Sequence, residues 1–213
     1  MKKNYLDFLD ELRSRAQLGI NYSRSPYDLE NYNALLQLAA DGYSEITGLP
    51  SEEIRERFKK ELGYITPKVG VNGALFNEEG KILLEHRSDD LLWGLPGGWV
   101  DVCEGPEDAV KREFMEEANL IVEPIHIIKF ITRLPHDFNQ PHTSVHILYL
   151  CKYVSGELKK SHESLELKYL DHKFIKDWHK DHGIWAEEAA KYHNELINST
   201  KLNLCLSPTP KQI

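Results

Sequence analysis

The sequence lacks several features that would mark a secreted, membrane-spanning or nucleic-acid-coating protein. It has no run of about 18 apolar residues, so we expect no membrane-spanning helix. Met1–Asp7 holds no apolar run that could act as a secretory signal. With 26 Lys and Arg against 34 Asp and Glu, the net charge is −8, and the basic excess expected of a nucleic-acid-binding protein is missing. The three cysteines, Cys103, Cys151 and Cys205, are widely spaced, which favours reduced thiols in a cytoplasm over a disulfide framework.

Apolar residues at helical spacing predict three helices in the N-terminal third of the chain. These helices are expected at residues 3–18, 27–39 and 51–62. Gly19 is the expected stop of the first helix, and Ser51 the expected N-cap of the third. Residues 1–66 carry 9 basic and 11 acidic side chains, a net charge of −2. This segment is therefore predicted to be a helical domain for interaction or dimerisation rather than for DNA binding.

From Val69 onward the apolar pattern changes to that of strands. Strands are expected at residues 69–76, 81–85, 122–133, 143–154 and 169–170, and helices at 106–118 and 178–197. One helix between strands and another at the end predict a layered α+β domain over 67–200. Residues 201–213, with Pro208 and Pro210, are predicted to be a loosely held tail.

Acidic side chains gather in one short stretch that carries the chemistry. Glu113, Glu116 and Glu117 have i, i+3, i+4 spacing, so a helix places them on one face. Pro106 suits the first position of that helix, and Asn119 tolerates the left-handed conformation that ends it. Carboxylates at this spacing repel one another unless they are solvated or a cation lies between them. Mg²⁺ prefers such oxygen ligands together with substrate phosphate.

The same stretch resembles the signature of the Nudix hydrolases, G-x5-E-x7-R-E-U-x-E-E-x-G-U, where U is a bulky aliphatic residue. The positions in register are Gly98, Glu104, Arg112, Glu113, Phe114, Glu116, Glu117 and Leu120. Two positions depart from the pattern, since Asn119 replaces glycine and Phe114 is aromatic. The resemblance implies an α/β/α sandwich with a mixed sheet, preceded by the small helical domain. That layout is similar to a bacterial subgroup that includes CDP-choline and ADP-ribose pyrophosphatases.

Roles for the charged residues follow from this resemblance. Glu116 and Glu117 are the expected principal metal ligands, Glu113 is next, and Glu104 either ligates or orients the ion. The ion is expected to be Mg²⁺, with Mn²⁺ able to take its place. Arg112 is expected to pair with a carboxylate and fix its rotamer. Arg112 and Glu116 thereby belong to the predicted catalytic set.

The resemblance also implies a general base outside the helix, on the loop before the last strand. Glu163 is the first choice and Glu166 the second, with two ordinary surface glutamates as the alternative. Gly98, Trp93 and His142 are predicted to contact the substrate. For Trp93 the alternative is packing against the acidic helix, and for His142 an ordinary surface position.

These residues predict a Mg²⁺-dependent pyrophosphohydrolase in which water cleaves the diphosphate bridge of a nucleoside diphosphate linked to another group. CDP-choline is the first expected substrate and ADP-ribose the second. The rival hypothesis is a non-catalytic nucleotide sensor that signals through the helical domain. The apolar stripes of the short helices need a partner surface, so we also predict a homodimer.

Overall fold

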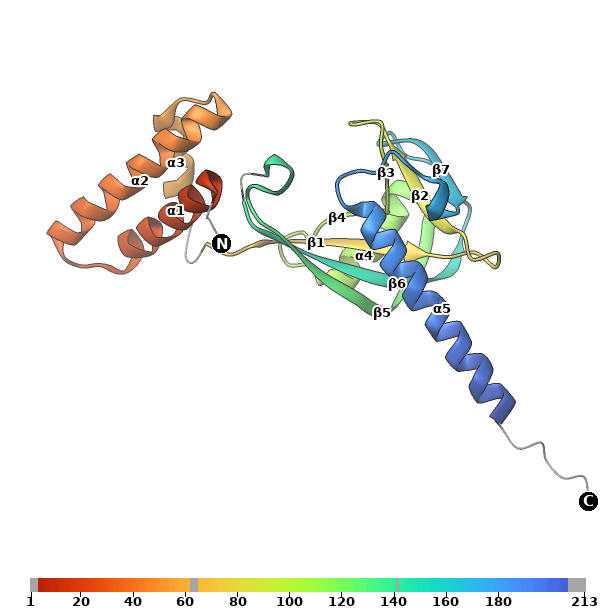
Figure 1. Cartoon of the computed structure of the whole chain (residues 1–213). Helices are drawn as coiled ribbons and strands as arrows, with labels where there is room; N and C mark the ends of the chain where they lie inside the picture. The colour runs from red at the N-terminus through yellow and green to blue at the C-terminus, as the bar shows by residue number, and fades with distance from the viewer. Residues whose placement is uncertain (1–3, 62–64, 141, 207–213) are drawn as a thin grey trace, which may run out of the picture. The chain divides into compact units, whose positions relative to one another are not determined.

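The computed structural model describes residues 4–61, 65–140 and 142–206, with the side chain of Asn139 and those beyond Ser199 left aside. Its elements are α1 (Tyr5–Tyr22), α2 (Pro26–Thr47), α3 (Ser51–Lys59), β1 (Lys68–Leu75), β2 (Ile82–Arg87), β3 (Trp93–Gly94), β4 (Gly97–Trp99), α4 (Pro106–Ala118), β5 (Leu120–Arg133), η1 (Asp137–Asn139), β6 (Ser144–Gly156), β7 (Ser164–Leu170), η2 (His172–Phe174) and α5 (His182–Leu206). They form two compact units (Figure 1). Unit 1 comprises residues 1–68 and 132–145, and unit 2 comprises residues 69–131 and 146–213. None of the helices described has the length and apolarity needed to cross a membrane.

Unit 1 is built on three helices whose starts are set by local capping. Asn4 and Asp7 form a capping box at the start of α1, and Ser25 caps α2 just before Pro26. Gly48 ends α2 in the left-handed conformation. The buried side chains shared by these helices are Leu9, Ala16, Leu36, Ala40, Tyr43, Ile54 and Phe58. The predicted helical region before the strands is therefore confirmed.

Several predicted helix boundaries in unit 1 are wrong. The second helix, expected at 27–39, runs from Pro26 to Thr47, and the third, expected to reach residue 62, ends at Lys59. The first helix runs through Gly19 to Tyr22, because Gly19 packs against the ring of Tyr32 and a Cβ there would lie 2.4 Å from that ring. Ser51 is the first residue of α3 rather than its N-cap. Its hydroxyl instead donates to Asp41 and accepts a hydrogen bond from Gln37.

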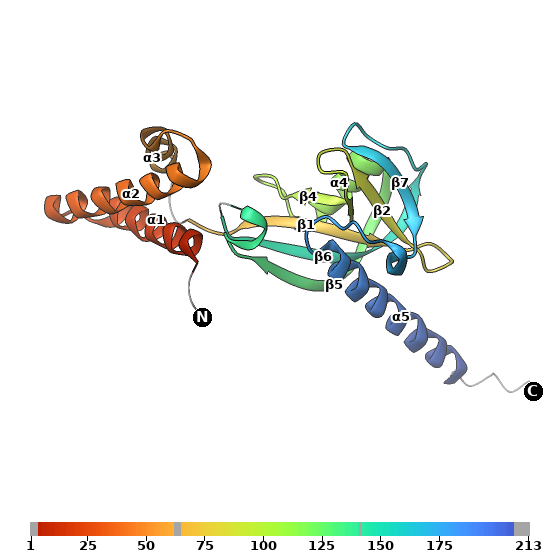
Figure 2. The ribbon, with the colours of Figure 1, turned by 45° about the horizontal axis from the view of Figure 1, so that its top comes forward.

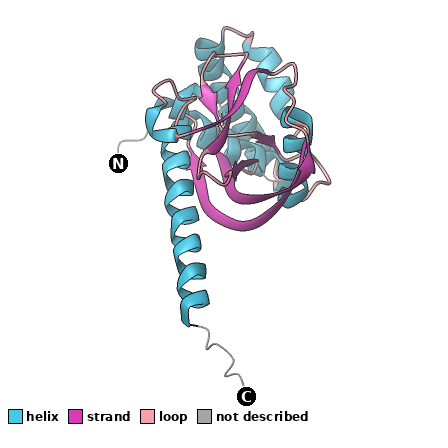
Figure 3. Cartoon of the chain, turned by 90° about the vertical axis from the view of Figure 1, so that its right-hand side faces the viewer, coloured by secondary structure: helices cyan, strands magenta, loops and turns pink. Residues whose placement is uncertain are grey.

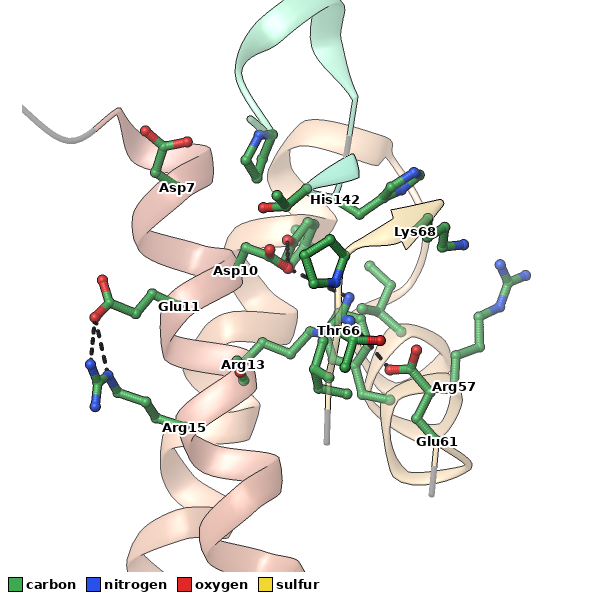
Figure 4. A pocket seen from close by; sticks show the side chains of 18 of the residues that line it. Asp7, Asp10, Glu11, Arg13, Arg15, Arg57, Glu61, Thr66, Lys68 and His142 are labelled. Atoms are coloured by element: carbon green, nitrogen blue, oxygen red, sulfur yellow. Dashed lines mark hydrogen bonds and ion pairs between the residues drawn. The ribbon is translucent and has the colours of Figure 1, made fainter. Parts of the chain in front are cut away.

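A cavity of about 760 Å³ lies within unit 1, between α1, α3 and the segments at 65–68 and 134–143 (Figure 4). Its walls carry side chains of both signs, including Asp7 and Asp10 on α1 and Lys68 opposite. Arg13 reaches into it, lies 4.6 Å above the ring of Phe58, and pairs with Asp10. Arg13 also pairs with Glu61, and Arg15 pairs with Glu11, so part of the charge on the cavity wall is already neutralised by neighbouring side chains.

Unit 2 contains two sheets. The four-stranded sheet is mixed and has the order β4-β1-β6-β5, and the three-stranded sheet is antiparallel with the order β3-β2-β7. Figure 2 shows β1, β6 and β5 side by side. The alternation of strand side chains separates two cores. Leu83 of β2 and Tyr149 of β6 face α4, whereas Leu84 and Leu148 face α5. Helices on both sides of the strands confirm the layered α+β domain and the α/β/α sandwich that the resemblance implied.

Two predicted elements of unit 2 differ from the structure. The last strand is not confined to residues 169–170, because Ser164–Leu170 pairs along the whole of β2 and only residues up to 163 remain in the loop. The terminal helix begins at His182 rather than at residue 178, since Trp178 forms a bridge with Trp93. The helix continues to Leu206 and extends beyond the strands (Figure 3), so the predicted tail at 201–213 is helical at its start. Residues 207–213 lie outside the described part.

Candidate active site

Helix α4 is placed by signals at both of its ends. Gly105 precedes Pro106 at the first helical position, and Asn119 ends the helix with φ at 56°. Phe114 is fully buried on the face toward the strands. It fits there because Gly73 has no side chain, and a Cβ at that glycine would lie 2.2 Å from the phenylalanine ring. The aromatic departure from the signature is thus matched by a glycine on β1.

Arg112 organises the carboxylates that α4 presents. Its guanidinium donates two hydrogen bonds to Glu104, at 2.9 and 3.1 Å, and one each to Glu113 at 2.9 Å and Glu116 at 3.1 Å. It also donates to the backbone carbonyl of Trp99 at 3.0 Å. The hydrogen bond from Arg112 is the first reason that the pKa of Glu104 lies below its ordinary value. Arg112 therefore gathers three predicted metal ligands and fixes their rotamers.

Two glycines at the start of β4 let two glutamates of α4 approach the backbone. The N–H of Gly97 donates to Glu117 at 2.9 Å. Gly97 has φ at 144°, and a Cβ there would lie 2.1 Å from the carbonyl oxygen of Val71. A Cβ at Gly98 would lie 2.5 Å from Oε1 of Glu113. Gly98 is also a predicted substrate contact, but its lack of a side chain is already explained by the close approach of the Glu113 carboxylate.

Glu117 has a different environment from the glutamates held by Arg112. It is 4% exposed, and its pKa is raised well above 4.5, first by burial and then by the charges of Glu85 and Glu113. Burial also raises the pKa of Glu113, against the opposing effect of Arg112. A buried carboxylate surrounded by other carboxylates is stabilised by any cation that reaches it.

The donor chemistry of this region fits a hard divalent ion. Glu104, Glu113, Glu116 and Glu117 offer carboxylate oxygens alone, which are the ligands that Mg²⁺ prefers. Among the residues described, no three His, Cys, Asp or Glu side chains already converge on one point. Arg112 is the cation that holds three of these glutamates. Glu117 is not among them, and burial, followed by the charges of Glu85 and Glu113, raises its pKa although the N–H of Gly97 opposes this shift.

The two candidate bases occupy different positions. Burial is the first reason that the pKa values of Glu85, Glu113 and Glu117 are raised, and the negative charge of Glu163 raises each of them further. Glu163 is therefore close enough to interact electrostatically with all three. We call these four glutamates the acidic cluster. Glu166 lies on β7 opposite His86 and pairs with Lys168. Because strand side chains alternate, Glu166 projects from the face opposite to Glu85 and away from the acidic cluster.

Glu85 is the member of the acidic cluster that the sequence analysis missed. It is 2% exposed on β2, and burial raises its pKa although the Ser164 hydroxyl donates to it at 2.6 Å. An acid directly after the apolar residues 82–84 was the available signal. In a hairpin strand, however, an acid most often faces solvent, and only the pairing with β7 shows that this one does not.

The remaining predicted substrate contacts, Trp93 and His142, do not belong to the acidic cluster. Trp93 stacks on His86, with ring centroids 4.8 Å apart, and packs against the core beneath α5. Its backbone N–H donates to the carbonyl of Asp177 at 2.8 Å. His142 belongs to unit 1 and lines the cavity there (Figure 4). The contacts of Trp93 are those of a structural side chain, and His142 is in a different unit from the acidic cluster.

Comparison with known proteins gives the same picture for both units. A model of the NUDIX domain matches residues 66–189, and a model of a UDP-X-like N-terminal oligomerisation domain matches residues 3–58. The putative ADP-ribose pyrophosphatase YjhB of Bacillus subtilis is 31% identical over 158 residues, which cover 74% of this chain and 76% of that protein.

Two solved structures resemble the fold. An ADP-ribose pyrophosphatase from Streptococcus suis matches with a TM-score of 0.52 and 29% identity, over 60% of this chain and 92% of that chain. A UDP-X diphosphatase matches with a TM-score of 0.57 over 90% of this chain and 95% of that chain, at 20% identity. Since the NUDIX domain covers more than half of the sequence and three of the signature glutamates are gathered around Arg112, the chain belongs to the Nudix family and is a hydrolase of acid anhydrides.

Proposed function

We propose that this hydrolase cleaves the diphosphate bridge of a nucleoside diphosphate linked to a second group, with Mg²⁺ as cofactor. The observation that carries the proposal is the placement of Glu117, which is buried against the first glycine of β4 and lies next to the glutamates that Arg112 gathers. Water attacks one phosphorus, a new P–O bond forms, and the bond from that phosphorus to the bridging oxygen breaks. The products are a nucleoside monophosphate and the phosphorylated partner group.

The chain supplies positioning and charge for this reaction. Glu113, Glu116 and Glu117 would hold the ion, and Glu104 would hold or orient it. Bound there, Mg²⁺ would neutralise charge on the phosphate oxygens and make a water molecule easier to deprotonate. Arg112 keeps the side chains of Glu104, Glu113 and Glu116 in one place before the ion arrives.

We assign proton removal from the attacking water to Glu163 rather than to Glu166. Glu163 interacts electrostatically with the other members of the acidic cluster. Glu166 instead pairs with Lys168 on the opposite face of β7 from Glu85. A general base must lie within hydrogen-bond reach of the proton that it accepts. Glu163→Gln is therefore expected to lower kcat by about a hundredfold or more, and Glu166→Gln by less than about threefold.

The substrate is proposed from the named relatives and from the sequence. The names of two relatives point to ADP-ribose, and that of a structural neighbour points to UDP linked to another group. CDP-choline, the first choice from the sequence, remains a prediction beside them. A panel of ADP-ribose, CDP-choline, UDP-sugars and dinucleoside polyphosphates, assayed for nucleoside monophosphate with Mg²⁺ or Mn²⁺, would rank these classes.

The same panel tests the rival sensor hypothesis. Membership in a hydrolase family and the complete set of signature glutamates favour turnover. If nucleotides bind in calorimetry but none is cleaved at any metal concentration, the enzymatic proposal is rejected and the sensor hypothesis is favoured.

We further propose that the protein is a homodimer through its helical unit. Residues 3–58 match a domain described as an oligomerisation domain, and α1 and α2 expose large side chains such as Phe8, Tyr27 and Leu38. Light scattering at micromolar concentration is expected to give twice the chain mass of 24.6 kDa. A mass of one chain would reject the dimer.

A further inference from the structure

The loop that carries Glu163 is held in place by hydrogen bonds from two elements. On one side, the N–H groups of Lys159 and Ser161 donate to the last carbonyls of α4, at Ala118 (3.0 Å) and Glu117 (3.2 Å). These bonds satisfy helix carbonyls that have no partner within the helix. We call residues 159–163 the base loop. Its first half is thus attached to the helix that bears the signature glutamates.

On its other side, the base loop is attached to β2. The N–H of Ser88 donates to the carbonyl of Glu163 at 2.8 Å. One residue later, the hydroxyl of Ser164 donates to Oε1 of Glu85 at 2.6 Å. Ser164 is 4% exposed and Glu85 2% exposed, so water does not compete for this bond. The pairing of β2 with β7 shifts register between His86 and Arg87, next to this bond, and Ser164 pairs with Arg87 beyond the shift.

A hydrogen bond to a buried carboxylate is stronger than one between neutral groups, and leaving either partner alone is unfavourable. Glu85 and Ser164 therefore do more than fill space in the sheet. Their hydrogen bond holds the side chain of the residue that directly follows Glu163, next to the register shift in the strand pairing. A buried glutamate directly after three apolar residues has a physical reason to be present if it holds this loop.

We propose that Glu85 and Ser164 are positioning residues for Glu163. Their hydrogen bond sets the height and direction of the base loop above α4, and so sets the distance from Glu163 to the water that attacks phosphorus. This inference rests on the proposed function, because it takes Glu163 as the proton acceptor. It adds two residues to the catalytic apparatus that contact neither substrate nor metal.

The test is a kinetic double-mutant cycle in the full chain. Ser164→Ala is expected to lower kcat by about ten- to a hundredfold, the effect of a small misplacement of a reacting group, while KM changes by less than about threefold. In the Glu163→Gln background, Ser164→Ala is expected to lower kcat no further, since the loop then positions nothing. Ser155→Ala, which removes a hydroxyl from an exposed position at the end of β6, is the matched control. Equal effects of Ser164→Ala in both backgrounds would overturn the inference.

Variants of Glu85 separate positioning from electrostatics. Glu85→Gln keeps an oxygen that accepts the Ser164 hydroxyl but removes the charge, so it is expected to lose less kcat than Ser164→Ala. Glu85→Leu removes the acceptor and is expected to lose at least as much as Ser164→Ala. If Glu85→Gln lowers kcat more than Ser164→Ala does, the charge of Glu85 acts directly on the acidic cluster and the positioning role is wrong.

A readout without turnover keeps this inference separate from the proposed function. Amide hydrogen exchange is expected to be about tenfold faster in residues 159–164 of Ser164→Ala than in the unchanged protein, with α4 unaffected. Unchanged exchange would overturn the inference even in an active enzyme. Conversely, a Glu163→Gln variant with full kcat would reject the base assignment, and this inference with it, while the hydrolase activity stood. Failure to cleave any nucleotide, together with faster loop exchange, would reject the proposed function and leave the hydrogen-bonded attachment of the loop established.

Discussion

Glu117→Gln is expected to make the protein more stable and inactive at once. The side chain is 4% exposed, and burial, Glu85 and Glu113 together raise its pKa well above 4.5. A glutamine occupies nearly the same volume, and its carbonyl oxygen can still accept the N–H of Gly97, which now bonds to the carboxylate at 2.9 Å. The substitution therefore keeps the packing and removes only the charge.

The direction of the stability change follows from this shift in pKa. In the unfolded chain the carboxyl titrates near 4.5, and in the folded protein it titrates higher. The folded state therefore binds this proton more tightly, and the stability that the group contributes below about pH 4.5 is lost as the pH rises through the folded pKa. Glutamine does not ionise, so the stability of the variant does not fall in this way as the pH rises. At pH 8 we expect Glu117→Gln to gain about 1–2 kcal/mol, in the range seen for stabilising changes at strained functional sites.

For a chain of this size, that gain corresponds to an increase in Tm of about 2–8 °C in metal-free buffer. The gain should shrink at pH 5, where the carboxyl is closer to being protonated. Glu107→Gln, on the exposed first turn of the same helix, is the matched control and should not gain stability. Added Mg²⁺ should raise the Tm of the unchanged protein more than that of the variant. Losing a ligand interaction of about 4 kcal/mol should lower kcat about a thousandfold.

Two results would refute this reasoning. One is a Glu117→Gln variant that is less stable than the unchanged protein at pH 8 in a metal-free buffer. The other is a gain of equal size at pH 5 and pH 8, which would show that packing rather than charge is responsible.

Three further substitutions have expected outcomes. Gly98→Ala should raise the Mg²⁺ concentration for half-maximal activity by about tenfold with little change in Tm, because the new Cβ would lie 2.5 Å from Oε1 of Glu113 and displace that carboxylate; an unchanged requirement would contradict this. Arg112→Lys should lower kcat/KM by about ten- to a hundredfold, since lysine cannot bridge Glu104, Glu113 and Glu116, whereas Lys111→Arg should have little effect. Trp93→Ala should lower the free energy of unfolding by about 3 kcal/mol because its ring packs in the core under α5, and a rise in KM without loss of stability would show instead that it contacts substrate.

The parts of the structure that could be predicted from the sequence are those fixed by neighbouring residues. Helix α4 begins at Pro106 and ends before Asn119, as expected, because a proline at the first turn and a residue suited to positive φ act locally. The spacing of Glu113 and Glu117 likewise needs only the helical repeat. Gly19 misled the prediction because a glycine that ends a helix and one that accepts an aromatic ring look alike in a sequence, and only the ring of Tyr32 separates them.

The choice between Glu163 and Glu166 depended on a contact that no local signal encodes. Both glutamates lie in one polar stretch, which the sequence favoured as a loop because its apolar alternation is weak. Pairing with β2 converts residues from Ser164 onward into a strand, and the parity of that strand directs Glu166 away from the acidic cluster. The hydrogen bond between Glu85 and Ser164 lies at the first residue of that strand. Glu163 directly precedes the strand and therefore belongs to the base loop. If this hydrogen bond determines where the loop ends and the strand begins, a substitution at Glu85 should speed amide hydrogen exchange in the base loop while exchange in β2 stays slow. Protection that disappears from both together would mean that the strand, and not the carboxylate, holds the loop.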